Sequence, residues 1–159
     1  MSDQVNPELV LANTNESDDE VERWLQDLKS PDADARADSA FALGGSRARR
    51  DEVLQGLRAL LGDDDVVVVN FAAQSLGQLF DTASIQTMLG LLAIGPPRHR
   101  RGVAWAVAQL SGGLSETDRV DTALALDRYR RRARGRTRDH ADALVTDWAG
   151  KHSSARGRI

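Results

Sequence analysis

Two stretches of the sequence repeat each other and decide the fold. The first reads LKSPDADAR at residues 28–36 and continues as AFALG at residues 40–44. The second reads LGDDDVVVV at residues 61–69 and continues as AQSLG at residues 73–77. The matching positions keep one constant offset, which pairs Leu28 with Leu61, Ala40 with Ala73, Leu43 with Leu76 and Gly44 with Gly77. Self-similarity at such a period indicates a protein built from one repeated supersecondary unit.

A third copy follows with a small change of spacing. Its second helix repeats the apolar residues Val69, Ala72, Ala73 and Leu76 as Val103, Ala106, Val107 and Leu110. The first helices align through Val21, Trp24 and Leu28, then Leu54, Leu57 and Leu61, and then Ile85, Met88 and Leu92. The first helices of the second and third copies are separated by fewer residues than the second helices of the same two copies. The difference predicts a three-residue insertion in the turn at residues 93–101, and insertions in repeat proteins usually form loops, often on the binding face.

Each copy has the pattern of two helices. Its apolar residues are spaced as one face of a helix requires. Ser30 is the predicted N-cap of a helix with Pro31 at its first position, and Asp64 or Asp65 caps the corresponding helix of the second copy. A less regular fourth unit begins with a capping box at Ser115. We expect its helices at about residues 116–133 and 138–148, separated by Gly135.

The predicted fold is therefore all-α, a short right-handed α-solenoid of about three to four helical hairpins. The repeat domain should span residues 20–150, with units at 20–45, 50–79, 82–111 and a divergent cap at 115–150. Residues 1–19 and 151–159 are polar and lack apolar periodicity. We expect them to be a disordered acidic tail and a disordered basic tail.

The pattern of a leucine, an Asp-rich turn, Arg36 and then Ala-x-x-Leu-Gly resembles HEAT repeats, especially the short bacterial type related to phycobilin lyases. The resemblance covers about residues 20–113. It implies stacked helical hairpins whose second helices line a concave face. Val69 and Val103 stand where the family usually has arginine, so we expect no continuous Asp–Arg ladder along the stack.

Composition excludes several classes of protein. The chain has no cysteine, which rules out disulfides and thiolate metal sites. It shows no basic start followed by an apolar segment, and no apolar run of about 20 residues, so we expect a cytoplasmic protein. The net charge of −3 conceals an uneven distribution, with +7 on residues 98–159 and −6 on residues 1–30. Such a chain can present a basic face despite its acidic pI.

No constellation of residues predicts catalysis. His99, His140 and His152 fall in a turn, a helix start and a tail, and we interpret them as solvated surface residues. The three aspartates at 63–65 lack the spacing and terminal glutamate of a calcium loop, so they are interpreted as helix caps. The GGS at 44–46 lacks the lysine of a phosphate-binding loop. We therefore predict no catalytic residue, no bound metal and no cofactor, and a protein that is not an enzyme.

A partner would bind on the concave second helices. The repeat offset places exposed positions in register, and aromatic and arginine side chains are the types that anchor interfaces. The predicted partner-binding residues are Asp34, Asp38, Val67, Phe71, Arg101, Trp105 and Gln109. The alternative for Phe71 and Trp105 is that both rings pack between adjacent repeats.

Arginines form a second feature. The candidate patch for an anion or an acidic partner comprises Arg98, Arg100, Arg128, Arg130, Arg131, Arg132, Arg134, Arg136 and Arg138. It could bind nucleic acid or an acidic protein surface, or its arginines could be solvated and paired with nearby acids. Only Tyr129 accompanies them, so base stacking has little support.

These observations favour a non-enzymatic scaffold or adaptor that binds a partner protein, with an acidic surface, on the concave face of the stack. The first alternative is a nucleic-acid-associated protein that uses the arginine-rich surface. A further alternative, implied by the family resemblance alone, is an accessory subunit similar to a chaperone-lyase.

Overall fold

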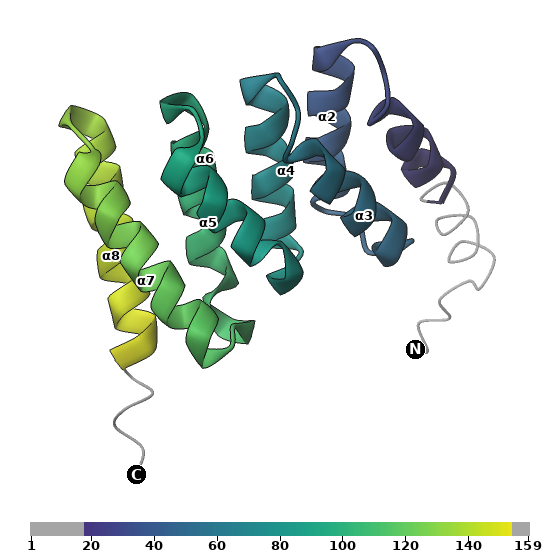
Figure 1. The fold of residues 1–159 in the computed structure, drawn as a ribbon. Coiled ribbons are helices and arrows are strands. Elements are labelled where there is room, and N and C mark those ends of the chain that lie inside the picture. The colour runs from purple at the N-terminus through teal and green to yellow at the C-terminus, as the bar shows by residue number, and fades with distance from the viewer. Residues whose placement is uncertain (1–17, 154–159) are drawn as a thin grey trace, which may run out of the picture.

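The computed structural model describes residues 18–153, and every regular element in that part of the chain is helical (Figure 1). The predicted tail segments 1–17 and 154–159 lie outside the described residues. A first helix occupies residues 18–27. It is followed by α2 (Ala33–Leu43), α3 (Arg50–Leu60), α4 (Val66–Gln78), η1 (Thr82–Ser84), α5 (Ile85–Ile94), α6 (Pro97–Gln109), η2 (Leu110–Gly113), α7 (Glu116–Arg132) and α8 (Gly135–Ser153).

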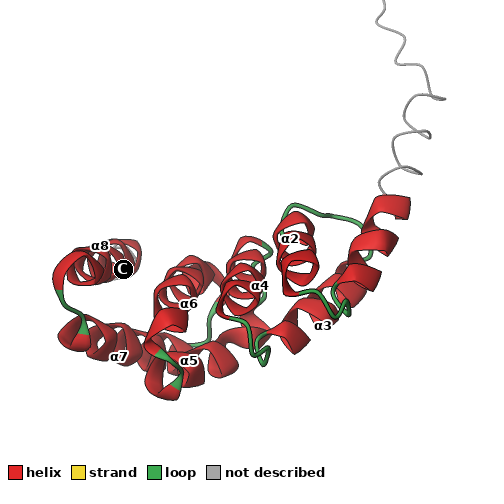
Figure 2. Cartoon of the chain, turned by 90° about the horizontal axis from the view of Figure 1, so that it is seen from above, coloured by secondary structure: helices red, strands yellow, loops and turns green. Residues whose placement is uncertain are grey.

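The helices form two rows, which confirms the predicted solenoid. Viewed from above, α2, α4, α6 and α8 make the inner row, and the first helix, α3, α5 and α7 make the outer row (Figure 2). Helices α2 and α6 pack on either side of α4, and α8 packs against α6. The stack bends toward the inner row, so the second helix of each hairpin lines the concave side.

The repeated leucines and alanines form a continuous core. Leu43, Leu76 and Leu110 are each fully buried. Alanines recur between neighbouring inner-row helices, as Ala40 with Ala73 and as Ala72 with Ala106, and let these helices approach closely. Gly77 lies against Ala106 so tightly that a Cβ there would be 3.1 Å from the alanine Cα. Close backbone approach is the physical reason for small residues in this register.

The helix caps are partly those expected. Asp65 caps α4 by accepting hydrogen bonds from the amides of Val67 and Val68, and Ser115 caps α7 by accepting one from Asp118. The prediction of Ser30 as a cap was wrong. Asp32 is the cap of α2, while Ser30 accepts a hydrogen bond from the Asp32 amide. A carboxylate at the N-terminus gains from the helix dipole as well as the hydrogen bond, which favours Asp32.

Two arginine–aspartate pairs join successive repeats on opposite edges. Arg36 donates two hydrogen bonds, of 2.9 and 3.1 Å, to the carboxylate of Asp63. Arg58 donates in the same forked manner to Asp81, at 2.8 and 2.5 Å. The first pair is one contact of the Asp–Arg series that the resemblance to HEAT repeats implies. The second pair lies at the opposite edge, where the loop after α4 connects one repeat to the next.

The predicted inserted loop is not a loop. Only Gly95 and Pro96 separate α5 from α6, and the extra residues form an additional turn at the start of α6. Pro97 occupies the first turn of that helix, where its fixed φ angle is favourable and its missing amide proton is not needed. The insertion therefore lengthens α6 at its N-terminus and places Arg98 and its neighbours in the added turn.

The last hairpin also differs from expectation. Helix α8 begins at Gly135, earlier than predicted, and continues to Ser153, so residues 151–153 are helical rather than part of a tail. Gly135 has a φ of +51°, which glycine adopts without strain. Trp148 is buried in this hairpin and contacts the His152 ring, with centroids 4.2 Å apart and the ring planes tilted by 46°. Among the described residues, none of the helices has the length and apolar character that a membrane crossing requires.

Candidate functional site

An open cleft of about 540 Å³ lies on the inner row, where α4, α6 and α8 meet. Helix α4 supplies two amide side chains, α6 supplies two arginines and a tryptophan, and α8 supplies one histidine. The lining residues are Asn70, Gln74, Arg98, Arg101, Gly102, Trp105 and His140. Gly102 makes room for Asn70, because a Cβ there would lie 2.4 Å from the Asn70 side-chain oxygen and would displace that side chain.

The cationic groups of the cleft are not neutralised internally. Within residues 18–153, neither Arg98 nor Arg101 forms an ion pair or donates a side-chain hydrogen bond, whereas the neighbouring Arg100 donates to the carbonyl of Gly95 at 3.1 Å. The helix start adds to the positive field. Helix α6 has Pro96 as its N-cap, no capping side chain, and no acid in its first turn.

Two buried polar atoms at the cleft have no hydrogen-bond partner within the described chain. They are the side-chain oxygen of Asn70 and Nε2 of His140. Burial lowers the pKa of His140, and although a hydrogen bond to the backbone of Arg101 opposes this, the positive charge of Arg101 lowers it further. A buried polar atom left without a partner costs free energy unless something pairs with it. The groups that the cleft presents to solvent are therefore the two free guanidinium groups of Arg98 and Arg101, above the buried oxygen of Asn70.

Aromatic side chains continue from the cleft toward the N-terminal end of the inner row. Trp105 and Phe71 are half-buried and pack against the core with part of each ring, so they are neither fully exposed nor enclosed between repeats. Phe41 on α2 meets Phe71 edge to face at a centroid distance of 5.3 Å and is 53% exposed.

Sequence reasoning missed Phe41, Asn70, Gln74 and His140. Phe41 is in register with Gln74, and the next residue in that series, Ala108, is fully buried. The residues at these three matching positions therefore gave no indication that Phe41 is exposed. His140 lies in the irregular last unit, where the repeat period no longer aligns positions with Trp105 and its neighbours. Its place in the cleft depends on how the last hairpin docks.

The residues predicted for partner binding all lie on inner-row helices. Asp34, Asp38, Val67 and Arg101 are exposed, and Gln109 is partly exposed. Of the seven predicted residues, only Arg101 and Trp105 line the cleft itself. The structure places the others along the same row, with the two aspartates on α2 at its far end from α8.

The arginine patch divides into paired and unpaired members. Arg130 and Arg131 both bind Asp127, at 2.9 and 2.7 Å, and Arg138 binds Asp142 at 3.2 Å. Arg132 donates to the carbonyl of Ala93. Within the described residues, the side chains without such a partner are Arg128, Arg134 and Arg136 in this segment and Arg98 and Arg101 at α6. Part of the patch is thus neutralised by its own helices.

The interpretation of the histidines as solvated was wrong. His99 is buried in the added first turn of α6, and His140 and His152 are half-buried on α8. Among residues 18–153, there is no group of three or more His, Asp or Glu side chains arranged to hold a metal ion.

Comparison with known proteins identifies the repeat. The family model described as HEAT repeats matches residues 21–108, which is more than half of the chain. No curated protein shows significant similarity to the chain. The matched segment ends within α6 and so includes Arg98, Arg101 and Trp105, but not His140.

Proposed function

We propose that this chain, which belongs to the HEAT-repeat family, is a non-enzymatic scaffold or adaptor that binds a segment of a partner protein on its concave face. HEAT repeats generally mediate protein–protein interaction. The observation that carries the proposal for this chain is the cleft between α4, α6 and α8, where Trp105 lies beside two unpaired arginines. Aromatic and arginine side chains contribute most of the binding energy in many interfaces.

The remaining features of the inner row suit a peptide rather than a small molecule. The cleft is open to solvent, and the aromatic surface extends from it to Phe71 and Phe41. A small-molecule site would bury most of its ligand in an enclosed cavity. A row of partly exposed rings, amides and charges over adjacent helices fits a ligand that runs across the helices.

Site-specific photo-crosslinking tests the proposal. A photoreactive amino acid is introduced at Gln74, in the cleft, and in a matched variant at Gln55, which is exposed on outer-row helix α3. We expect one defined partner segment to crosslink from position 74 and not from position 55. Equal labelling from both positions, or no crosslink from position 74, contradicts binding on the concave face.

The partner segment identified in this way is then measured as a purified peptide. Arg101→Ala removes an exposed group that makes no internal ion pair, so the fold should be unchanged while the affinity falls. Trp105→Ala should weaken binding and lower the melting temperature only moderately, because the ring packs against the core with part of its surface. If Trp105→Ala instead collapses the melting transition and Arg101→Ala leaves the affinity intact, the two residues have a structural role and the cleft is not the binding site.

A further inference from the structure

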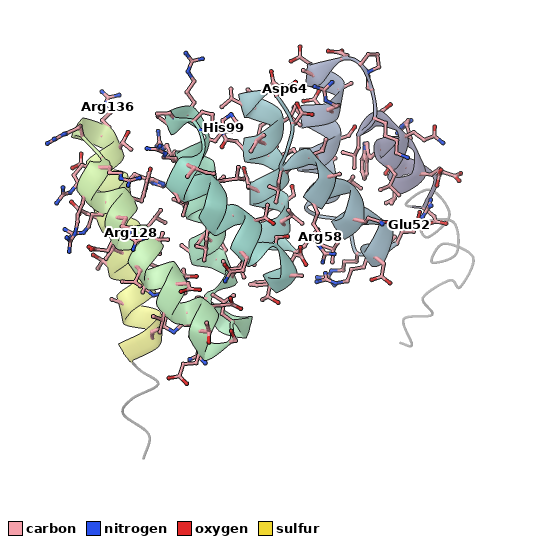
Figure 3. The ribbon with its side chains drawn as sticks, in the orientation of Figure 1. Glu52, Arg58, Asp64, His99, Arg128 and Arg136 are labelled. Atoms are coloured by element: carbon pink, nitrogen blue, oxygen red, sulfur yellow. The ribbon has the colours of Figure 1, made fainter. Side chains whose placement is uncertain are left out.

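The inner row carries unpaired acidic side chains near one end and unpaired arginines near the other. At its N-terminal end, Asp34 and Asp38 on α2 are exposed, and their carboxylates pair with no cation among residues 18–153. Two helices further along, Arg98 and Arg101 on α6 are equally unpaired. On the edge where the inner-row helices begin, Asp64 and Arg136 likewise lie toward opposite ends of the stack (Figure 3).

The middle of the row is apolar and aromatic. Phe41 and Phe71 meet between the acidic and the basic ends, and Val67 on α4 is 48% exposed. In residues 18–153, Phe41 and Val67 are the large apolar side chains of the inner row that are clearly exposed. Exposed apolar groups of this size on one face favour burial by a partner.

From these three zones we infer the chemistry and the direction of the bound segment. It carries basic residues against Asp34 and Asp38, apolar residues over Phe41 and Phe71, and acidic residues in the cleft at Arg98 and Arg101. The segment therefore lies in one orientation along the stack. This inference rests on the proposed function, because it describes the partner of the same face.

The spacing of the helices sets the length of such a segment. Packed helices lie about 8–10 Å apart, so α2 and α6 are separated by roughly 20 Å across α4. An extended chain advances about 3.3 Å per residue, so roughly six residues connect the two charged zones.

Charge matching explains why the two ends must differ. A segment that is acidic throughout would place carboxylates against Asp34 and Asp38, and a basic one would place cations against the two arginines. Like charges in juxtaposition suppress the wrong partner, while opposite charges speed the encounter with the right one. Two charged ends of opposite sign also distinguish the two directions of one peptide.

Binding to two synthetic peptides tests the inference. The first has two lysines at one end, three apolar residues including phenylalanine, and two glutamates at the other end. The second has the same length and apolar centre but glutamates at both ends. We expect the bipolar peptide to bind wild type more tightly. Arg98→Glu with Arg101→Glu should weaken its binding by about tenfold or more.

Charge reversal at the other end provides the decisive comparison. Asp34→Lys with Asp38→Lys should weaken the bipolar peptide and strengthen the uniformly acidic one. Gln55→Lys with Ala59→Lys adds positive charge on outer-row helix α3 and should change neither affinity by more than about twofold. If the acidic peptide binds wild type as well as the bipolar one does, or if Asp34→Lys with Asp38→Lys fails to strengthen the acidic peptide, the inference is overturned.

Direction is measured with a spin label on either end of the bipolar peptide. A label on the acidic end should broaden the amide resonances of Arg101 and His140, and a label on the basic end those of Asp34 and Asp38. Equal broadening of both sets by both labels overturns the fixed direction. If the crosslinked partner still depends on Trp105 while these charge variants have no effect, the inference fails and the proposed function stands. Loss of the crosslink from position 74 is the separate result that removes the proposed function.

Discussion

Asp81 shows how a single side chain can join two repeats. It is 4% exposed and is the one buried acidic residue among residues 18–153. Burial alone would raise its pKa, but hydrogen bonds from Arg58 and Ser84 outweigh this and hold the pKa below its ordinary value. The carboxylate therefore stays ionised in the fold. Asp81 is the last residue of the loop between α4 and η1.

We expect Asp81→Asn to lower the free energy of unfolding at neutral pH by about 2 kcal/mol, because a buried charge-assisted pair is lost while the exposed Arg58 can return to water. Asp81 has a folded pKa below its unfolded value, so its contribution is present above the unfolded pKa and is lost as pH falls through the folded one. The variant should therefore lose less stability on acidification than wild type. Urea unfolding at several pH values measures both effects. Asp64→Asn, at an exposed aspartate, is the control and should change stability by less than about 0.5 kcal/mol.

Phe80 carries backbone strain at a helix end. Its φ is +54°, and the amides of Phe80 and Asp81 donate to the carbonyls of Gly77 and Leu76, the pattern that usually has glycine at this position. The side chain is 66% exposed, so burial does little to offset the strain.

Phe80→Gly should raise the free energy of unfolding by up to about 1 kcal/mol by relieving the left-handed conformation. Phe80→Ala keeps a Cβ in the same conformation and should show no such gain. Thermal unfolding of the two variants measures the difference. A destabilised glycine variant would contradict the prediction and would show that the phenyl ring packs to an extent its exposure does not indicate.

The charges at the N-terminus of helix α6 are unfavourable for the helix dipole. Its first turns contain Arg98, Arg100 and Arg101 and no acid, although cations are unfavourable at a helix N-terminus. Helix α8 begins in a similar way with Arg136. The difference is that Arg98 lines the cleft and Arg136 does not. The extra turn of α6 therefore costs stability at the place where the candidate site has its charge.

Arg98→Glu should increase the free energy of unfolding by about 0.5 kcal/mol and at the same time weaken binding of the partner segment. Arg136→Glu is the matched control, with a similar gain in stability and no loss of affinity. Denaturation and peptide binding on the same preparations separate the two effects. An equal loss of affinity in both variants would place the binding charge in the general field of the C-terminal arginines and not in the cleft.

The contact between α4 and α6 depends on glycine. Gly77→Ala should lower the free energy of unfolding by about 1–3 kcal/mol, because the new methyl group would meet the backbone of Ala106 and separate the two helices. Gly90→Ala, in α5, is the control. A Cβ at Gly90 meets nothing within 4 Å, so this variant should be stabilised by up to about 1 kcal/mol through helix propensity. Equal effects of the two substitutions on the urea midpoint would contradict close packing at Gly77.

Across the stack, the distribution of charge matters more than its sum. Within residues 18–153, acids exceed bases toward the N-terminal end of the stack and bases exceed acids from residue 98 onward, and pairs such as Arg130–Asp127 neutralise part of the basic end. Among the described residues of the basic end, unpaired arginines are spread over α6, α7, the short link after α7 and the start of α8. This arrangement supports selective recognition of an oppositely charged protein segment more than a continuous nucleic-acid track.

Binding to duplex DNA at increasing salt tests that interpretation. We expect weak binding at low salt that disappears near physiological ionic strength, because few unpaired arginines are available to release counterions. The bipolar peptide should retain its binding better, because its apolar centre contacts Phe41 and Phe71. Fluorescence anisotropy with both labelled ligands provides the comparison. DNA binding that survives physiological salt and is lost in an Arg128→Ala, Arg134→Ala, Arg136→Ala variant would support the nucleic-acid alternative.

The stacked helical hairpins were predictable from the order of residues, because leucines and alanines that recur at a constant spacing can be buried together only by placing identical units side by side. Arg101 and Trp105 were predictable for the same reason, since the period aligns exposed positions on the inner row. Other features depended on packing between helices. The three-residue insertion became a turn of helix, because Pro97 has the fixed φ angle that the first position of a helix favours. His140 joined the cleft through the docking of α8, and Phe71 and Trp105 became half-buried, because contacts between helices far apart in sequence leave no local pattern.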